Sequence, residues 1–161
     1  MTDALMSVQN ERAIASLLHR YAEVLDSDLL EQWPDLFAED GVYKVWPREN
    51  ALRGLPLALM LCEGRDSMWD RIRSLREANI YNEHFPRHLV SNIRLIGESA
   101  GVFEVSSAYV VYQTDLNGRT QLFSVGQYQD RISISQGVAK FLARTVLCDS
   151  FAVPTLLAIP L

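Results

Sequence analysis

The N-terminal stretch has the spacing of an amphipathic helix. Between Asn10 and Leu25 apolar residues recur every three or four positions, at Ile14, Leu17, Leu18, Tyr21 and Leu25. A single apolar face at this period predicts an α-helix that packs against a core. Residues 1–9, which precede it, are expected to form a loose N-terminal arm.

A second helix is expected soon after the first. Asp28 can cap it, and Glu31, three residues later, completes a capping-box pattern. This helix would run to Phe37 with a kink at Pro34, because proline has no amide hydrogen to donate. The sequence Glu39-Asp40-Gly41 that follows is typical of a turn.

The middle of the chain predicts two short strands and a third helix. Residues 42–45 alternate apolar and polar side chains, as a half-buried strand does. Residues 48–56 look irregular, and the apolar run 57–61 favours a second strand. A helix capped by Asp66 or Ser67 is then expected. Its inner face would carry Met68, Ile72, Leu75 and Asn79.

The second half of the chain has the pattern of four consecutive strands. They are expected at His88–Ile96, Gly101–Asp115, Arg119–Ser133 and Val138–Cys148. Asn117-Gly118 and Gln136-Gly137 are tight-turn signals between them, and Gly126 indicates a bulge or bend. Short connections predict an antiparallel meander. The predicted fold class is therefore α+β, with a curved antiparallel sheet wrapped round N-terminal helices and a pocket between them.

Composition restricts the class of protein. A length of 161 residues and an apolar fraction of 48% predict one domain spanning 1–161. The net charge of −5 argues against a nucleic-acid partner. No apolar run approaches the roughly 20 residues of a membrane span, and no secretory signal is visible. The isolated Cys62 and Cys148 are expected to be buried thiols, which suits a reducing cytoplasm.

The order of helices and strands resembles the cone-shaped fold of nuclear transport factor two, scytalone dehydratase and ketosteroid isomerase. The run YAEVLDSDLLEQWPDLFAEDGVYKV carries this resemblance. A narrower resemblance comes from DRIRSLREANIYNEHFPRHLVSNIRL and from RTVLCDSFAVPTLLAIPL near the end. These two segments resemble the small (beta) subunit of aromatic-ring-hydroxylating Rieske oxygenases, most closely those of salicylate 5-hydroxylase and terephthalate dioxygenase.

The resemblance implies a function for the chain within a complex. It implies a hexamer of three large and three small subunits, in which the small subunits form a trimer. The [2Fe–2S] Rieske cluster, the mononuclear Fe(II) and the substrate pocket would all lie in the large (alpha) subunit, which also receives electrons from NAD(P)H through a ferredoxin or reductase. The complex would hydroxylate a small aromatic acid such as salicylate, terephthalate, anthranilate or benzoate. The small subunit would be structural.

The candidate metal ligands do not form a redox centre. A Rieske cluster needs closely spaced pairs of Cys and His, and the chain has no Cys-x-His sequence. His84, His88 and the adjacent Glu83 have the residue types of a mononuclear iron site. Pro86, however, lies between the two histidines and disrupts a helical arrangement of them. We therefore expect no cofactor or metal in this chain.

Cone-fold enzymes use Tyr, Asp or His side chains that project into the pocket. The candidates here are Tyr21, Asp26, Tyr43 and His88. Tyr21 can equally be a core tyrosine, Asp26 can simply end the first helix, and His88 can hold a loop or face a neighbouring subunit. An alternative function is therefore a stand-alone lyase or isomerase that uses His88 with Tyr21 or Tyr43, and a weaker one is a ligand-binding module without chemistry.

Arginine and aromatic residues gather in the stretch 66–95. This composition is typical of a protein–protein interface. The alternative is a solvated helix face with internal ion pairs such as Asp70 with Arg73. The predicted subunit-interface residues are Trp69, Arg71, Arg73, Arg76, Tyr81, Phe85, Arg87 and His88.

The segment 149–161 is almost wholly apolar. Exposed to water, such a segment would promote aggregation, so it must be buried. It can pack on its own sheet or on a neighbouring subunit, and the second alternative is preferred. Pro154 and Pro160 argue against a regular strand in this segment.

Overall fold

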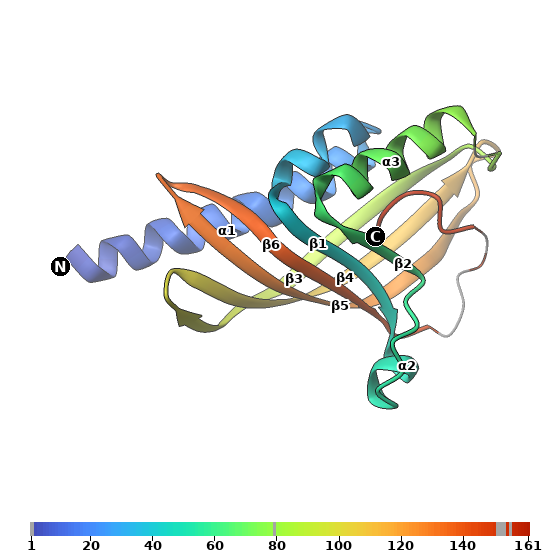
Figure 1. The fold of residues 1–161 in the computed structure, drawn as a ribbon. Helices are drawn as coiled ribbons and strands as arrows, with labels where there is room; N and C mark the ends of the chain where they lie inside the picture. Colours follow the sequence, from blue (N-terminus) through green and yellow to red (C-terminus); the bar gives the residue numbers. More distant parts are fainter. Residues whose placement is uncertain (1, 79, 151–153, 155) are drawn as a thin grey trace.

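The computed structural model describes residues 2–78, 80–150, 154 and 156–161, and the side chains from residue 8 onward. One long helix comes first, and six strands carry most of the rest (Figure 1). The elements are α1 (Thr2–Asp26), η1 (Leu30–Gln32), η2 (Pro34–Leu36), β1 (Phe37–Pro47), α2 (Arg48–Leu52), β2 (Met60–Glu63), α3 (Gly64–Glu77), β3 (His84–Ser99), β4 (Val102–Asp115), β5 (Thr120–Ser135) and β6 (Val138–Cys148).

The six strands form one curved sheet in the order β2-β1-β6-β5-β4-β3. The antiparallel meander from β3 to β6 is the one that the sequence predicts. β1 joins β6 in parallel, a pairing that periodicity did not indicate. α1 and α3 pack on the inner, concave face, where one core joins their apolar sides to the inward side chains of the strands (Figure 1). The interior of the cone is therefore the space between α1, α3 and the concave face of the sheet.

The apolar face predicted for the first helix is confirmed. Its five residues, from Ile14 to Leu25, are all buried in the core. The helix is longer than predicted, however, because α1 begins at Thr2 within the stretch expected to be a loose arm. The physical reason is that residues 2–9 contain neither glycine nor proline, so nothing in them ends a helix.

The predicted second helix is replaced by the two single-turn 3₁₀ helices η1 and η2. Pro34 occupies the first position of η2, where its missing amide hydrogen costs nothing. Asp28 does not act as a side-chain cap. It adopts a left-handed conformation with φ of 54° and directs its carboxylate to Arg76. Residues 39–41, expected as a turn, lie instead within a bulged part of β1.

The region between β1 and α3 is more regular than predicted. Residues 48–52 form α2, and β2 starts at Met60 rather than at Leu57. α3 begins at Gly64, slightly before the predicted caps. Its predicted inner residues Met68, Ile72 and Leu75 are buried, and Asn79 lies outside the described residues.

Gly126 has a different role from the one predicted. The irregularity in β5 lies at Phe123, because Val111 pairs with Ser124 while the next residue pairs with Leu122. Gly126 instead marks a close approach of β5 and β6. A Cβ atom at this position would lie 1.9 Å from the carbonyl oxygen of Leu147. Only glycine fits here without moving the backbone.

Gly126→Ala is accordingly expected to destabilise the fold by about 3 kcal/mol, since a buried overlap with main-chain atoms cannot relax through a rotamer change. Gly97→Ala in β3 is the matched control, because a Cβ atom there meets nothing within 4 Å. Urea denaturation of both variants measures the difference. Equal midpoints for the two variants would contradict the close approach of β5 and β6.

Candidate functional site

Asp26 and His88 form a buried pair between the end of α1 and β3. Asp26 is the last residue of α1, and both of its carboxylate oxygens accept the main-chain N–H of His88 at 3.0 Å. The Nδ1 atom of His88 lies 2.6 Å from Asp26 Oδ1. A carboxylate only accepts, so Nδ1 carries the hydrogen and Nε2 is turned to the interior. Asp26 thus ends α1 and also fixes β3 against it, a role that helix patterning alone did not reveal.

The Nε2 atom of His88 is buried and has no hydrogen-bond partner among the described residues. It faces a cavity of about 10 Å³, whose lining includes Gln113, Phe123, Leu156 and residues 158–161. A space of this size holds one water molecule at most. The pair has the geometry of a general base and its orienting carboxylate, but a substrate has no room beside it.

Tyr21 and Tyr43 point at the end of the same apolar segment. The hydroxyl groups of Tyr21 and Tyr43 donate to the Leu161 carbonyl oxygen at 2.6 Å and 3.2 Å, and the Leu161 amide lies 2.8 Å from the Tyr43 hydroxyl oxygen. Burial raises the pKa of Tyr21 to about 12 and the pKa of Tyr43 well above its ordinary value. Both hydroxyl groups therefore stay neutral at physiological pH, and neither can act as a base.

Residues 157–161 fill the cone. Leu157, Ala158, Ile159 and Leu161 are all buried within the core of their own chain. The guanidinium of Arg71 on α3 donates to the carbonyl oxygens of Leu157 at 2.6 Å and Ala158 at 3.2 Å. Of the two alternatives for the apolar segment, its last five residues therefore pack within their own chain.

Arg144 and Asp130 form a buried ion pair that the sequence analysis did not single out. Arg144 donates from Nε and Nη2 to the two Asp130 oxygens, each at 2.8 Å, and both side chains are fully buried. The guanidinium carbon also lies about 4 Å from the ring centres of Tyr21, Tyr128 and Phe141. Burial raises the pKa of the Asp130 carboxyl, and the positive charge of Arg144 opposes that rise. The sequence signal that could have revealed this pair is the opposite charge of Asp130 and Arg144, which both stand at inward positions in strands of alternating apolar and polar residues. In the structure they face each other across the adjacent strands β5 and β6.

The predicted interface residues fall into two groups. The first group, Arg71, Arg76 and His88, forms hydrogen bonds with other residues of the same chain. Arg76 binds Asp28 and Glu31, and its hydrogen bonds lower the pKa of Glu31. The others, apart from half-buried Tyr81, lie at the surface. Arg73 pairs there with Asp70 at 3.7 Å, the internal ion pair expected under the alternative of a solvated helix face, and Arg87 lies 3.7 Å from the Asp26 carboxylate. The exposed ones are Trp69, Arg73, Phe85 and Arg87.

The donor set of this chain does not suit a Rieske cluster or a mononuclear iron. Over residues 2–78, 80–150, 154 and 156–161, no three His, Cys, Asp or Glu side chains are grouped so that they could hold a metal ion. Each relevant histidine already uses one ring nitrogen, His84 with the Asn82 carbonyl oxygen at 2.7 Å and His88 with Asp26. Both cysteines are buried, which raises the pKa of each thiol and disfavours the thiolate that a metal requires.

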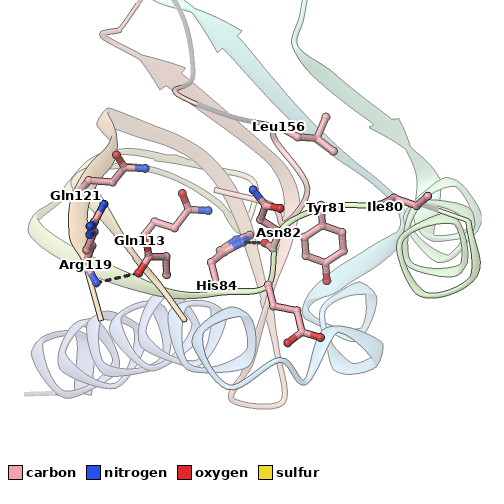
Figure 2. A pocket seen from close by; sticks show the side chains of 10 residues that line it. Ile80, Tyr81, Asn82, His84, Gln113, Arg119, Gln121 and Leu156 are labelled. Carbon is pink, nitrogen blue, oxygen red and sulfur yellow. Dashed lines mark hydrogen bonds between the residues drawn. The ribbon is translucent and has the colours of Figure 1, made fainter. Parts of the chain in front are cut away.

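A second and larger space opens at the mouth of the cone. Figure 2 shows this pocket, which has a volume of about 520 Å³. It lies between the connection Ile80–His84, the ends of β4 and β5 that meet at the Asn117-Gly118 turn, and Leu156. His84, Gln113 and Leu156 line both this pocket and the small cavity at His88.

Comparison with known proteins places this geometry in context. A family model described as "Ring hydroxylating beta subunit" matches residues 20–154. The anthranilate 1,2-dioxygenase small subunit of Burkholderia cepacia is 39% identical over 92% of this chain and 92% of the relative. The beta 1 subunit of the terminal oxygenase component of terephthalate 1,2-dioxygenase from Comamonas sp. is 35% identical over 94% of this chain and 99% of the relative.

Solved structures agree with the fold. A chain from Novosphingobium aromaticivorans, provisionally identified as the beta subunit of an aromatic-ring-hydroxylating dioxygenase, superposes with a TM-score of 0.87 at 37% identity, over 98% of this chain and 99% of that one. A chain from the same organism that is provisionally identified as a scytalone dehydratase superposes with a TM-score of 0.69 at 22% identity, over 96% of this chain and 95% of that one. The predicted cone fold is confirmed. Among the described residues, no helix is both long and apolar enough to cross a membrane.

Proposed function

The chain belongs to the ring hydroxylating beta subunit family, and from this premise we propose that it is the non-catalytic small subunit of a multicomponent Rieske non-haem iron oxygenase. The observation that carries the proposal is the filled cone. Residues 157–161 occupy the interior, and Tyr21 and Tyr43 are bound to Leu161 rather than facing a substrate. The alternative of a stand-alone lyase or isomerase is not favoured, because that function needs an open pocket beside His88.

The relatives support an aromatic acid as the substrate of the complex. Anthranilate and terephthalate, which name the two relatives above, are both benzene carboxylates. We infer that the large subunit hydroxylates a substrate of this kind, with electrons that reach it from NAD(P)H through a ferredoxin or reductase. The Rieske cluster and the mononuclear Fe(II) then belong to the large subunit, in keeping with the donor set of this chain, which does not suit them.

The proposed assembly is a hexamer of three large and three small subunits, with residues 1–161 of each small subunit acting as one domain. The side chains proposed for a subunit contact are the exposed Trp69 and Arg73 on α3 and the exposed Phe85 and Arg87 on β3. Exposed aromatic and arginine side chains of this kind carry much of the binding energy at interfaces. The two buried free thiols suit a cytoplasmic complex.

A double variant, Phe85→Ala with Arg87→Ala, tests this surface. Phe85 is 62% exposed, and the 71% exposed Arg87 side chain makes only a 3.7 Å ion pair with Asp26, so their removal costs the isolated fold about 1 kcal/mol or less. Loss of two interface anchors is expected to weaken assembly at least about tenfold. The chain is co-expressed with its large subunit, and the complex is weighed by native mass spectrometry during dilution. Leu52→Ala, at an 82% exposed site on α2, is the control. Identical dissociation of the double variant, the control and the unaltered complex would exclude Phe85 and Arg87 from the interface.

A further inference from the structure

The pocket at the mouth of the cone has a polar end and an apolar end. Arg119, Gln121 and Gln113 gather at one end, and Tyr81, Ile80 and Leu156 at the other (Figure 2). Such a separation suits a ligand with one polar group and one flat apolar body. The volume of about 520 Å³ lies within the range of small-molecule sites.

Gln113 supplies an amide group to the polar end of the pocket. It lies on the inner face of β4, where it is only 7% exposed, and it pairs across the sheet with Gln121. Its side-chain amide makes no hydrogen bond with any described residue. The amide borders the pocket, so a molecule bound there can supply the partner.

Arg119 places a positive charge beside that amide. The main chain holds it firmly, because its N–H donates to Asp115 Oδ1 at 2.9 Å and its carbonyl accepts from the Asp115 N–H at 3.0 Å. The guanidinium forms neither an ion pair nor a hydrogen bond within the described part of the chain. It is therefore available to a ligand anion, which a guanidinium binds with two parallel hydrogen bonds.

Two carboxylates, Glu83 and Asp115, also line the pocket, and their negative charges oppose the binding of an anion beside Arg119. Asp115 Oδ1 already accepts two main-chain N–H groups, from Asn117 and Arg119, which offset part of its charge. Glu83 is exposed to solvent, where water and salt screen it. The Nδ1–H of His84 is used by Asn82, so its ring is held in one orientation, edge-on to Tyr81 at 5.8 Å.

We propose that this pocket binds a single-ring aromatic carboxylate. The carboxylate lies against the Arg119 guanidinium and the amides of Gln113 and Gln121, and the ring packs among Tyr81, Ile80 and Leu156. This gives the small subunit a ligand site of its own. The evidence for this ligand site is the set of residues that line the pocket, and the site goes beyond the proposed function. The ligand site and the proposed function can therefore be refuted independently.

Ligand-observed NMR titration of the purified full chain with benzoate tests the site, with benzamide as the uncharged probe. We expect saturable binding of benzoate and weaker binding of benzamide. Arg119→Gln should weaken benzoate binding about tenfold or more, because a charge-assisted contact is lost. Arg53→Gln, an exposed arginine on the surface after α2, is the matched control and should bind as the unaltered chain does. Circular dichroism checks that both variants fold.

Three results would overturn the site. They are no saturable binding of benzoate at millimolar concentration, equal affinity for benzoate and benzamide, and equal benzoate affinity in the Arg119→Gln and Arg53→Gln variants. Assembly with the large subunit is measured on the same variants and is expected to be unchanged. A chain that assembles but does not bind benzoate refutes this site alone. A chain that binds benzoate but never assembles refutes the proposed function and leaves the site standing.

Discussion

Asp130→Asn is expected to lower the free energy of unfolding by about 4 kcal/mol, because it leaves the fully buried charge of Arg144 without its counter-ion. Asparagine has the size of aspartate, so the change removes charge and not volume. The rings of Tyr21, Tyr128 and Phe141 around the guanidinium cannot replace a carboxylate that accepts two hydrogen bonds at 2.8 Å. Urea denaturation measures the loss.

Two controls separate this effect from a general sensitivity of the sheet. The double change Asp130→Leu with Arg144→Met removes both charges and should recover stability to within about 1 kcal/mol of the unaltered chain. Glu49→Gln breaks an exposed ion pair with Arg53 and should cost less than about 1 kcal/mol. If Asp130→Asn were no worse than Glu49→Gln, the ion pair would not be the buried, paired unit described above.

The second large effect concerns the segment that fills the cone. Replacing Leu157, Ile159 and Leu161 together by alanine removes three buried side chains, each worth about 2 kcal/mol or more. The sum of about 6 kcal/mol approaches the whole stability of an ordinary domain. We therefore expect the triple variant to lose near-UV circular dichroism and to bind a hydrophobic dye, as a protein with an opened core does.

Leu156→Ala is the control for the triple variant, because this neighbouring side chain is half-exposed and its removal should cost less than about 1 kcal/mol. A triple variant with the denaturation midpoint of Leu156→Ala would show that the segment does not fill the cone in solution. It would also reopen the alternative of a pocket that admits substrate to His88.

Local patterns predicted the elements whose signals are local. The apolar period of α1, the inner face of α3 and the Asn117-Gly118 turn each depend on residues close in sequence, and the structure confirms them. The β3–β6 meander follows from short connections. The parallel pairing of β1 with β6 joins residues about a hundred positions apart, and no local period encodes it.

The misjudged features share one cause, which is that distant contacts override local preference. Asp28 looks like a helix cap, but Arg76 of α3 attracts its carboxylate. Gly126 looks like a bulge, but its constraint comes from Leu147 on the next strand. Asp26 looks like a helix terminator, and its second role depends on His88, 62 residues away. The resemblance to oxygenase small subunits is confirmed, whereas individual contacts could be assigned only from the structure.

The candidate site changed most between sequence and structure. Histidines, arginines and aromatic residues at 66–95 could form an active site or an interface. The structure divides them among three tasks: Arg71 holds the segment in the cone, His88 is fixed to Asp26, and Tyr81 lines the pocket at the mouth. What remains for a partner is the exposed set defined by Trp69, Arg73, Phe85 and Arg87.

The most direct measurement of the central claim is the turnover of the assembled oxygenase with His88→Gln in its small subunit. Activity on an aromatic acid is expressed per assembled complex, which is counted by native mass spectrometry, so that any loss of stability is removed from the comparison. A structural small subunit predicts kcat within about twofold of the unaltered complex. A normally assembled complex with kcat reduced about a hundredfold, the scale of a lost general acid or base, would contradict the account and place His88 in the chemistry.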